Sequence, residues 1–508
     1  MTFKSTEEQE EIFRSILHDD CNLLIRAYAG CGKSTTMLLA IKKLIEFYGD
    51  VKKTISIIAF NKHIRDEMKS KLPEGVNCST LHGIGYGGIT RKYKDIKMDI
   101  FKVDNHIKKK LTHWQLDSEF KKEGEKERYI KAIKEMVDLC RSTLTTDRSF
   151  VLKLADKYDI KPIKTLGDAK RVLQVLESMT NDIKTFDYVD MIYMPAVDNK
   201  IFLFPSDFLI TEEIQDLNRA QQKMIEKMCK RDKVTKKITT KLISVGDKKQ
   251  AIYAFTGVGE KSFDWFKEFP NTKELPLSHS FRCAKNIILE ANKIVPEIKA
   301  LSNAASGIVR SGNVLSEAQS GDFVLCRTTA PLVKLFFYYI SQSRTATIVG
   351  TEIGTNLIDM LGSFINVNDL LIYWMNRLEI LRDSLKSMGV LDVYEDNAYQ
   401  SLDDKVTTLA FIAKYCKSTV DLKEKILKIF TDDKDNRGII LSTIHKSKGL
   451  EADRVFIVRT DLLPLKAAMS RPWLLEQEYN LKYVAITRAR NELIYDYEWN
   501  DDVKEKNN

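Results

Sequence analysis

A glycine-containing turn at residues 27–35 (AYAGCGKST) carries the clearest chemical signal in the sequence. Its small residues would let backbone N–H groups close around phosphate oxygens, and the helix that follows would add a favourable dipole. At this spacing Lys33 would reach the β- and γ-phosphates of a nucleotide, and Ser34 would ligate magnesium. Ala27 stands where the strict phosphate-loop pattern has glycine, a mild departure. We expect nucleotide contacts from Ala29, Gly30, Cys31, Gly32, Lys33, Ser34 and Thr35.

An apolar stretch at 208–211 (FLIT) runs directly into two carboxylates, Glu212 and Glu213. Beside a phosphate loop, the end of such a strand is where a magnesium ligand and a water-activating base belong. Glu212 would lie over the metal, and Glu213 would polarise the attacking water. The alternative is an ordinary acidic helix start, because carboxylates favour helix N-termini. The nearby phosphate loop favours the catalytic interpretation.

Strands and helices alternate around these two motifs. Residues 22–27 and 54–60 have the pattern of short buried strands, and residues 9–18 and 33–48 have that of amphipathic helices. Such alternation predicts an α/β fold with parallel sheets. We expect Pro270 and Pro276 to bracket a crossover into a second α/β unit, and a helix after Leu474. Further strands are expected at 208–211, 242–245, 323–326, 346–349, 438–442 and 454–458.

Two helical stretches, at 86–186 and 361–436, interrupt the α/β pattern. The first is lysine-rich and poor in β-branched runs, and the second has mixed charge. Both are expected to be insertions. The basic run at 227–241 is interpreted as an exposed, solvated loop rather than a dedicated DNA-binding patch.

The composition narrows the class of protein. The 508 residues are 44% hydrophobic and 30% charged, enough for several folded domains, and the net charge of +9 suits a polyanionic partner. No two of the eight cysteines have C-x-x-C spacing, so we expect no zinc site and no iron–sulfur cluster. The polar N-terminus and the lack of a long apolar run predict no secretion signal, no membrane contact and a cytoplasmic protein of bacterial or viral (phage) type.

Seven further segments, together with the two motifs above, resemble the UvrD/Rep/PcrA-type superfamily 1 DNA helicases. The most diagnostic is 245–257 (VGDKKQAIYAFTG), which is similar to the family's VGDxxQxIYxFxGA motif. Its glutamine and its aromatic residues would place a nucleotide sensor and base-stacking groups on one loop. The other six are 59–62 (AFNK), 79–83 (STLHG), 186–191 (FDYVDM), 277–282 (LSHSFR), 441–451 (LSTIHKSKGLE) and 480–489 (NLKYVAITRA).

The resemblance implies two RecA-like P-loop domains with parallel sheets, each carrying a helical insertion. The first domain (1A) would comprise 1–85 and 187–275, with insertion 1B at 86–186. The second (2A) would comprise 276–360 and 437–508, with a short 2B-like insertion at 361–436.

The resemblance also implies the roles of individual residues. ATP would lie between Lys33, Glu213 and Gln250 on one side and Arg282 and Arg488 on the other, with Arg488 as an arginine finger. Gln9 would read adenine, Phe281 would stack on it, and Glu451 would face the ribose; Mg²⁺ would be held by Ser34 and Glu212. Single-stranded DNA would contact Phe60, Asn61, His82, Tyr253, Phe255, Thr443 and His445.

The implied activity is an ATP-dependent DNA helicase that moves 3′→5′ on single-stranded DNA and unwinds duplex. Single-stranded and tailed duplex DNA would be its substrates, and replication or repair proteins its partners. Departures from the family pattern keep two alternatives open. Glu212 replaces the usual aspartate, which motivates a weakly hydrolysing or non-hydrolysing DNA-binding protein. The short second insertion motivates a protein-displacing translocase without processive unwinding. Thr256 and His279 also depart from the pattern.

Overall fold

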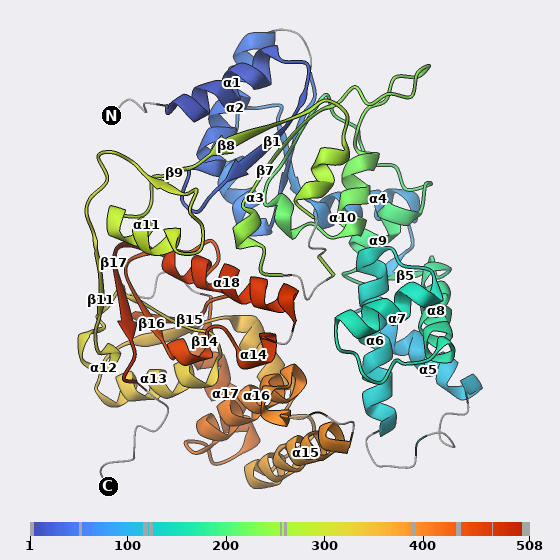
Figure 1. Ribbon diagram of the computed structural model, residues 1–508. Coiled ribbons are helices and arrows are strands. Elements are labelled where there is room, and N and C mark those ends of the chain that lie inside the picture. The colour runs from blue at the N-terminus through green and yellow to red at the C-terminus, as the bar shows by residue number, and fades with distance from the viewer. Residues whose placement is uncertain are drawn as a thin grey trace. The chain divides into compact units, whose positions relative to one another are not determined.

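The computed structural model describes residues 5–49, 53–114, 120, 125–253, 257–258, 262–387, 390, 392–432, 438–469 and 471–499. The chain divides into two compact units (Figure 1). Unit 1 comprises Met1–Ala27 and Gly32–Leu277, and unit 2 comprises Tyr28–Cys31 and Ser278–Asn508.

Unit 1 is built on a parallel sheet with six strands among the described residues, in the order β3-β2-β6-β7-β1-β8. Because every pairing is parallel, the carboxyl ends of all these strands meet at one edge of the sheet. The strands are β1 (Asn22–Ala27), β2 (Ile55–Ala59), β3 (Asn77–Thr80), β6 (Phe208–Thr211), β7 (Lys241–Gly246) and β8 (Thr272–Leu277).

The helices that connect these strands begin where the sequence offers a cap. Thr6 and Gln9 form a reciprocal capping box at the start of the first helix, and Asn61 caps the third through Ile64 N–H. The helices are α1 (Glu7–His18), α2 (Lys33–Tyr48), α3 (Lys62–Lys69), α4 (Leu81–Lys92), α9 (Asp190–Val197) and α10 (Arg219–Lys227).

A helical part of unit 1 lies between α4 and α9 and has its own hydrophobic core. It contains α5 (Lys102–Trp114), α6 (Glu125–Thr143), α7 (Arg148–Lys157) and α8 (Leu166–Thr180), with the short strands β4 (Lys97–Met98) and β5 (Thr185–Phe186) at its base. Buried ion pairs tie these helices to the start of α9: Lys102 Nζ lies 2.7 Å from Asp190, and Arg141 lies 2.7 Å from Asp187.

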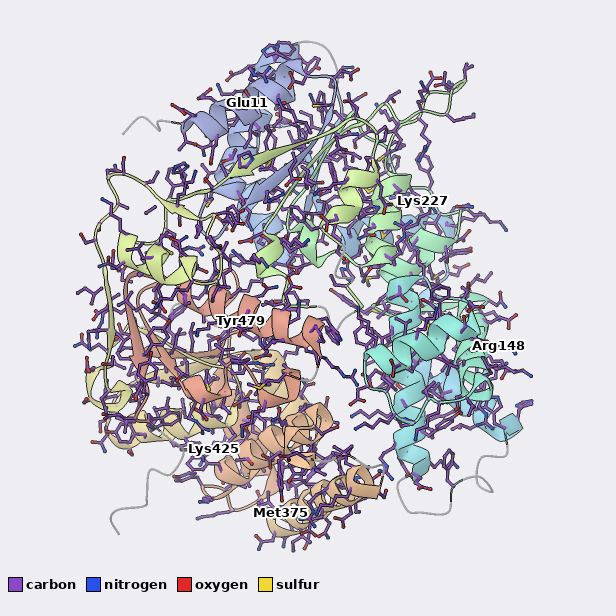
Figure 2. All side chains as sticks on the ribbon, in the orientation of Figure 1. Glu11, Arg148, Lys227, Met375, Lys425 and Tyr479 are labelled. Atoms are coloured by element: carbon purple, nitrogen blue, oxygen red, sulfur yellow. The ribbon has the colours of Figure 1, made fainter. Side chains whose placement is uncertain are left out.

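The basic run at 227–241 has structural residues at its two ends and an exposed turn between them. Lys227, labelled in Figure 2, donates to the carbonyls of Pro195 and Asp198, and Lys241 donates to the carbonyl of Ile16. The two end residues are therefore structural. Between them, the turn around Val234 is exposed, as expected from the sequence.

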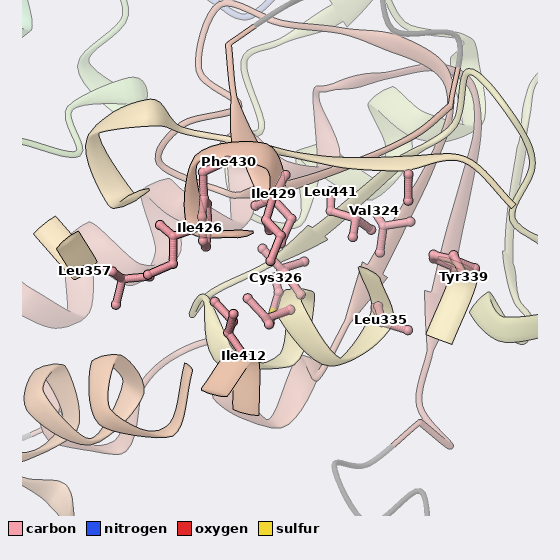
Figure 3. Packing of buried hydrophobic residues seen from close by; sticks show 14 of the residues in the cluster. Val324, Cys326, Leu335, Tyr339, Leu357, Ile412, Ile426, Ile429, Phe430 and Leu441 are labelled. Atoms are coloured by element: carbon pink, nitrogen blue, oxygen red, sulfur yellow. The ribbon is translucent and has the colours of Figure 1, made fainter. Parts of the chain in front are cut away.

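Unit 2 contains a parallel sheet whose described strands follow the order β11-β17-β16-β12-β15-β13-β14. Apolar side chains of α13 (Ala330–Ser341), α16 (Asn397–Ala413) and α17 (Thr419–Ile429) pack with those of its strands, as Figure 3 shows around Cys326, Ile412 and Ile426. The main strands are β11 (Ile308–Ser311), β12 (Phe323–Cys326), β13 (Ala346–Val349), β14 (Phe430–Thr431), β15 (Ile439–Thr443), β16 (Ala452–Val458) and β17 (Ala489–Asp496).

The described helices of unit 2 lie between its strands and in the stretch expected to be the second insertion. They are α11 (Lys285–Asn292), α12 (Val314–Glu317), α13 (Ala330–Ser341), α14 (Thr351–Asp359), α15 (Val367–Ser387), α16 (Asn397–Ala413), α17 (Thr419–Ile429) and α18 (Pro472–Ile486). A short ribbon pairs β9 (His279–Ser280) with β10 (Lys299–Ala300). Among the residues that the structure describes, no helix is long and apolar enough to cross a membrane.

The predicted parallel α/β fold is confirmed, and several element bounds match the structure residue for residue, including 22–27, 33–48, 208–211, 323–326 and 346–349. One local prediction is wrong. Pro276 does not belong to a crossover: it lies inside β8, opposite Arg26 of β1. An edge strand tolerates proline because its outer side needs no ladder hydrogen bond.

Candidate nucleotide and nucleic-acid sites

The phosphate-loop residues adopt the backbone that a phosphate cradle requires. Gly30 and Gly32 have φ of +71° and +72°, the left-handed region in which glycine is unstrained. Gly32 is the N-cap of α2, and Lys33 is its first residue. No side chain caps the N–H groups at the start of α2, where an anion would be favoured; phosphate binding at this loop stays a prediction.

Lys33 and Glu213 form an ion pair in unit 1, with Nζ and Oε1 2.5 Å apart. Glu213 has φ of +51°, a strained conformation for a residue with a side chain. Its other carboxylate oxygen accepts a hydrogen bond of 2.5 Å from Gln215 Nε2. The strained backbone and the Gln215 contact hold the carboxylate against the lysine that is expected to bind phosphate.

Glu212 is buried beside this pair, with 5% of its surface exposed. Burial, and next the neighbouring charge of Glu213, raise its pKa to about 7. Its carboxylate hydrogen-bonds to the Ser34 side chain, and its Oε1 has no hydrogen-bond partner among the described residues. A buried, unsatisfied carboxylate oxygen next to a serine hydroxyl fits a Mg²⁺ ion, a hard cation that prefers oxygen ligands.

A third carboxylate, Asp247, belongs to the same site and was absent from the predicted site residues. It follows β7, the neighbour of β6, and is fully buried. Burial raises its pKa to about 6. It accepts a hydrogen bond of 2.8 Å from Gln250 Nε2 and so orients the predicted sensor glutamine. The sequence signal was its place in the VGDxxQ pattern, three residues before Gln250.

No group of three or more His, Cys, Asp or Glu side chains within the described ranges is placed to hold a metal ion by itself. Mg²⁺ at a nucleotide site needs only one or two protein ligands, because phosphates and water supply the rest. Ser34 and Glu212 remain the predicted ligands.

Gln9 is completely buried and both ends of its carboxamide are engaged. Its Oε1 accepts from Thr6 N–H at 3.0 Å, and its Nε2 donates to Thr36 Oγ1 at 2.9 Å. The side chain thus links the start of α1 to α2. Adenine reading by Gln9 stays a prediction.

The expected DNA contacts in unit 1 follow two adjacent strands. Phe60 comes directly after β2, and its ring stacks on Tyr253 with centroids 6.2 Å apart. His82 lies near the start of α4, directly after β3, and stacks on Tyr188 at 4.3 Å. Asn61 Oδ1 accepts from Ile64 N–H, so this side chain serves as a helix cap. Phe255, like Thr256, lies outside the described residues.

The predicted residues of unit 2 form a cluster of charge around Glu451. This carboxylate pairs with Arg282 and, at 2.6 Å, with Arg490. Arg488 is 1% exposed and donates to the carbonyls of Val484 and Leu450 at 2.9 and 3.0 Å. Burial, and next the charge of Arg282, lower the pKa of Arg488 to about 9.

Three other predicted residues of unit 2 differ in exposure. Phe281 is 42% exposed, as an adenine-stacking ring requires. Thr443 is buried at the end of β15, where its Oγ1 accepts from Lys446 N–H. Burial lowers the pKa of His445 to about 3, so this imidazole is neutral. DNA contacts by Thr443 and His445 stay predictions.

Two family models match this chain. The UvrD/REP helicase N-terminal domain matches residues 6–269, and the UvrD-like helicase C-terminal domain matches residues 378–498. The F-box DNA helicase protein 1 of Schizosaccharomyces pombe is 26% identical over 96% of this chain and 57% of its own length.

Two further relatives have similar names. The F-box DNA helicase 1 of Gallus gallus is 22% identical over 97% of this chain and 49% of its own length. The ATP-dependent DNA helicase Rep of Buchnera aphidicola (from Acyrthosiphon pisum) is 23% identical over 58% of this chain and 46% of its own length. The chain thus spans about half the length of these relatives.

Proposed function

The chain belongs to the UvrD/Rep family of helicases, and on that basis we propose that it is an ATP-dependent DNA helicase. It would translocate 3′→5′ on single-stranded DNA and unwind tailed duplexes. One observation carries the proposal most strongly: the carboxyl edge of one parallel sheet bears both the Lys33–Glu213–Glu212 cluster and two stacked aromatic pairs.

The chemistry at this edge would begin with an exchange of partners. When ATP enters, Lys33 would leave Glu213 and bind the phosphates, because several phosphate charges outweigh one carboxylate. Glu213 would then be free to accept a hydrogen bond from the attacking water and to take its proton. Ser34 and Glu212 would hold Mg²⁺, which neutralises charge on the phosphates.

Gln250 would report hydrolysis to the DNA side. Its carboxamide is held by Asp247, and Tyr253 follows it by only three residues. A movement of Gln250 toward or away from the γ-phosphate would therefore reach the Phe60–Tyr253 stack directly. This short connection would couple each ATP cycle to a change in grip on the strand.

The remaining contacts to the nucleotide are proposed on family grounds alone. Phe281 would stack on the base, and Arg282 and Arg488 would stabilise charge that develops on the transferred phosphoryl group. Glu451 would contact the ribose. To do so, its carboxylate would lose part of its contact with the two arginines. Replication or repair proteins are proposed as partners on family grounds alone.

A second candidate is a DNA-binding protein that hydrolyses ATP weakly, and the raised pKa of Glu212 favours it. Because of the raised pKa, this carboxyl binds a proton more tightly than an exposed glutamate does, and a protonated carboxyl is a poor Mg²⁺ ligand. The longer glutamate also changes the reach of the ligand by one methylene. A strand-translocating ATPase without unwinding remains the third candidate.

Two assays separate these candidates. ATP hydrolysis is measured with and without single-stranded DNA, with Lys33→Ala as the matched inactive control. Hydrolysis no faster than that of the control would refute both motor proposals. Strand separation is then followed on duplexes with a 3′ or a 5′ tail. Unwinding of the 3′-tailed substrate supports the helicase, and DNA-stimulated hydrolysis without strand separation supports the translocase.

A further inference from the structure

We propose that Arg490 is a positioning residue of the nucleotide site, and that it orients the Glu451 carboxylate toward a hydroxyl group of the ribose. The inference rests on the proposed function, in which Glu451 contacts the ribose, and adds the residue that fixes this carboxylate. The sequence motifs assign no role to Arg490, which lies two positions after Arg488.

The two arginines that pair with Glu451 bind different oxygens of its carboxylate. Arg490 holds Oε1 with two nitrogens, Nε at 3.1 Å and Nη2 at 2.6 Å. Arg282 forms an ion pair through its Nε with Oε2. A carboxylate that is held firmly by one oxygen can release a partner from the other oxygen without losing its orientation. The geometry therefore separates a cation that can leave, Arg282, from a cation that can stay, Arg490.

An irregularity of the sheet lies at the position of Arg490. β16 and β17 are parallel neighbours (Figure 1), and Ala452 pairs with Ala489 whereas Arg454 pairs with Glu492. Two steps along β16 thus correspond to three steps along β17, so β17 has one extra residue between these pairs. Such bulges redirect side chains and are frequent next to active sites. The bulge includes Arg490, whose side chain reaches the residues at the start of β16.

Further contacts fix both the backbone and the side chain of Arg490. Its carbonyl accepts a hydrogen bond of 2.8 Å from the N–H of Ala284, two residues after Arg282. Its Nη1 lies 3.7 Å from the Asp453 carboxylate. All of the guanidinium nitrogens thus face a carboxylate, Nε and Nη2 toward Glu451 and Nη1 toward Asp453. A lysine, which carries a single nitrogen, cannot reproduce this planar fork.

The charge state of Glu451 suits a contact with a hydroxyl donor. Burial alone would raise its pKa, but the charge of Arg282 and the hydrogen bond from Arg490 outweigh burial and hold the pKa below its usual value. The carboxylate is therefore ionised at neutral pH and acts only as an acceptor. When Arg282 turns toward the phosphates, Oε2 loses its donor, and a ribose hydroxyl would take that place. Arg490 would keep the carboxylate neutralised and oriented throughout this exchange.

The test is steady-state hydrolysis of ATP, 2′-deoxy-ATP and 3′-deoxy-ATP by the full chain with saturating single-stranded oligo(dT). Each analogue lacks one ribose hydroxyl, so the ratio of kcat/KM for ATP to kcat/KM for the analogue measures the ribose contact. Wild type should favour ATP over one analogue by roughly tenfold or more, which corresponds to one hydrogen bond to a charged group. Glu451→Ala should reduce this preference to about twofold or less, because the acceptor is gone.

The Arg490 variants test the positioning role. Arg490→Ala should lower the preference to about threefold or less, because the carboxylate is no longer held through Oε1. Arg490→Lys should restore only part of the preference, since it keeps the charge without the fork. The Arg490→Ala/Glu451→Ala double variant should match Glu451→Ala, because Arg490 acts through Glu451. If Arg490→Ala does not fold, Arg490→Gln takes its place with the same expected result.

Arg310→Ala is the matched control. Arg310 and Arg490 have similar side-chain exposure, 36% and 46%, and both lie in the sheet of unit 2. Arg310 also pairs with two carboxylates, those of Glu317 and Glu492. A purely structural loss lowers kcat/KM for ATP and for the analogues by the same factor and leaves their ratio unchanged. Arg310→Ala should therefore keep the wild-type ratio.

The outcomes separate this role of Arg490 from the proposed function. If wild type shows no DNA-stimulated hydrolysis of ATP, the helicase proposal itself fails. If wild type hydrolyses ATP and Arg490→Ala keeps the wild-type ratio, only the positioning role is refuted. A wild type that does not distinguish ATP from either analogue would also refute this role, because Glu451 would then make no contact with the ribose.

Discussion

Replacement of Glu212 by glutamine should change how the stability of unit 1 depends on pH. The pKa of Glu212 is raised from 4.5 to about 7, chiefly because the carboxylate is buried. The folded protein therefore binds this proton more tightly than the unfolded chain does. Tighter proton binding stabilises the folded state. This contribution to the free energy of unfolding is fully present below pH 4.5 and is lost as the pH rises through about 7. At about 1.4 kcal/mol for each pH unit between the two pKa values, the loss is up to about 3–4 kcal/mol.

The assay is urea unfolding of the nucleotide-free protein at pH 5 and pH 8, for wild type and for Glu212→Gln. Asp247 also titrates in this interval, with a pKa raised to about 6 by burial, but it does so in both proteins. The difference between the two proteins then isolates Glu212. Wild type should lose about 2–3 kcal/mol more than the variant between the two pH values. Mg²⁺ with ATP should restore wild type at pH 8, since a cation replaces the proton. Parallel pH dependences would refute the reasoning, because Glu212 would then titrate like an exposed carboxylate.

Three further predictions concern the charged groups. Arg488→Ala should lower the DNA-stimulated kcat by about 10³-fold or more if Arg488 acts as an arginine finger, and Arg488→Lys should restore only part of this kcat. Steady-state ATP hydrolysis measures the effect. An unchanged kcat would show that the role of the buried arginine is structural. Arg141→Met should destabilise the protein by about 3–5 kcal/mol, because it leaves the buried Asp187 carboxylate without its cation and Asp190 with Lys102 alone; urea unfolding measures the loss, and a change below about 1 kcal/mol would contradict the buried network. Affinity for oligo(dT) should fall linearly on a log–log plot as salt rises, with a slope of about −0.7 for each phosphate neutralised; a salt-independent affinity would count against a phosphate-binding groove.

The sequence predicts best what is local. The strand–turn–helix at 22–48 and the strand at 208–211 are found with their predicted bounds, because glycine conformation, helix start and apolar runs are properties of a few adjacent residues. The edge strand β8 is not predicted from the sequence, because proline normally interrupts a strand. Proline is tolerated in an edge strand, but an edge position cannot be recognised before the strand order is known. The C-terminal strand β17 was missed as well, because its charged first half hides an apolar second half.

Contacts between distant residues are the other part that sequence reasoning could not supply. His82 and Tyr188 are more than a hundred residues apart, and only the fold shows that one ring covers the other. Likewise, Gln9 has the spacing of an adenine-reading residue, but its carboxamide is engaged by Thr6 and Thr36. Motif spacing locates a residue near a site; the partners of its side chain decide which of its atoms are available for chemistry.

The segment from Asp247 to Tyr253 connects the two ends of the proposed motor, and its length limits how it can work. Tyr253 lies three positions after Gln250, so the chain between them can span at most about 11 Å even when fully extended. Asp247 is fully buried and holds Gln250 through its carboxamide, so the nucleotide end of the segment cannot drift freely. If Gln250 moves by a distance comparable to the length of a hydrogen bond, either Ala251 and Ile252 must change conformation or Tyr253 must move as well. Ile252 is itself buried, so this residue has little room to change its conformation. The coupling between hydrolysis and DNA grip is therefore expected to be mechanical and short-ranged, and insertion of a single glycine after Ala251 should preserve ATP binding while it uncouples hydrolysis from DNA stimulation.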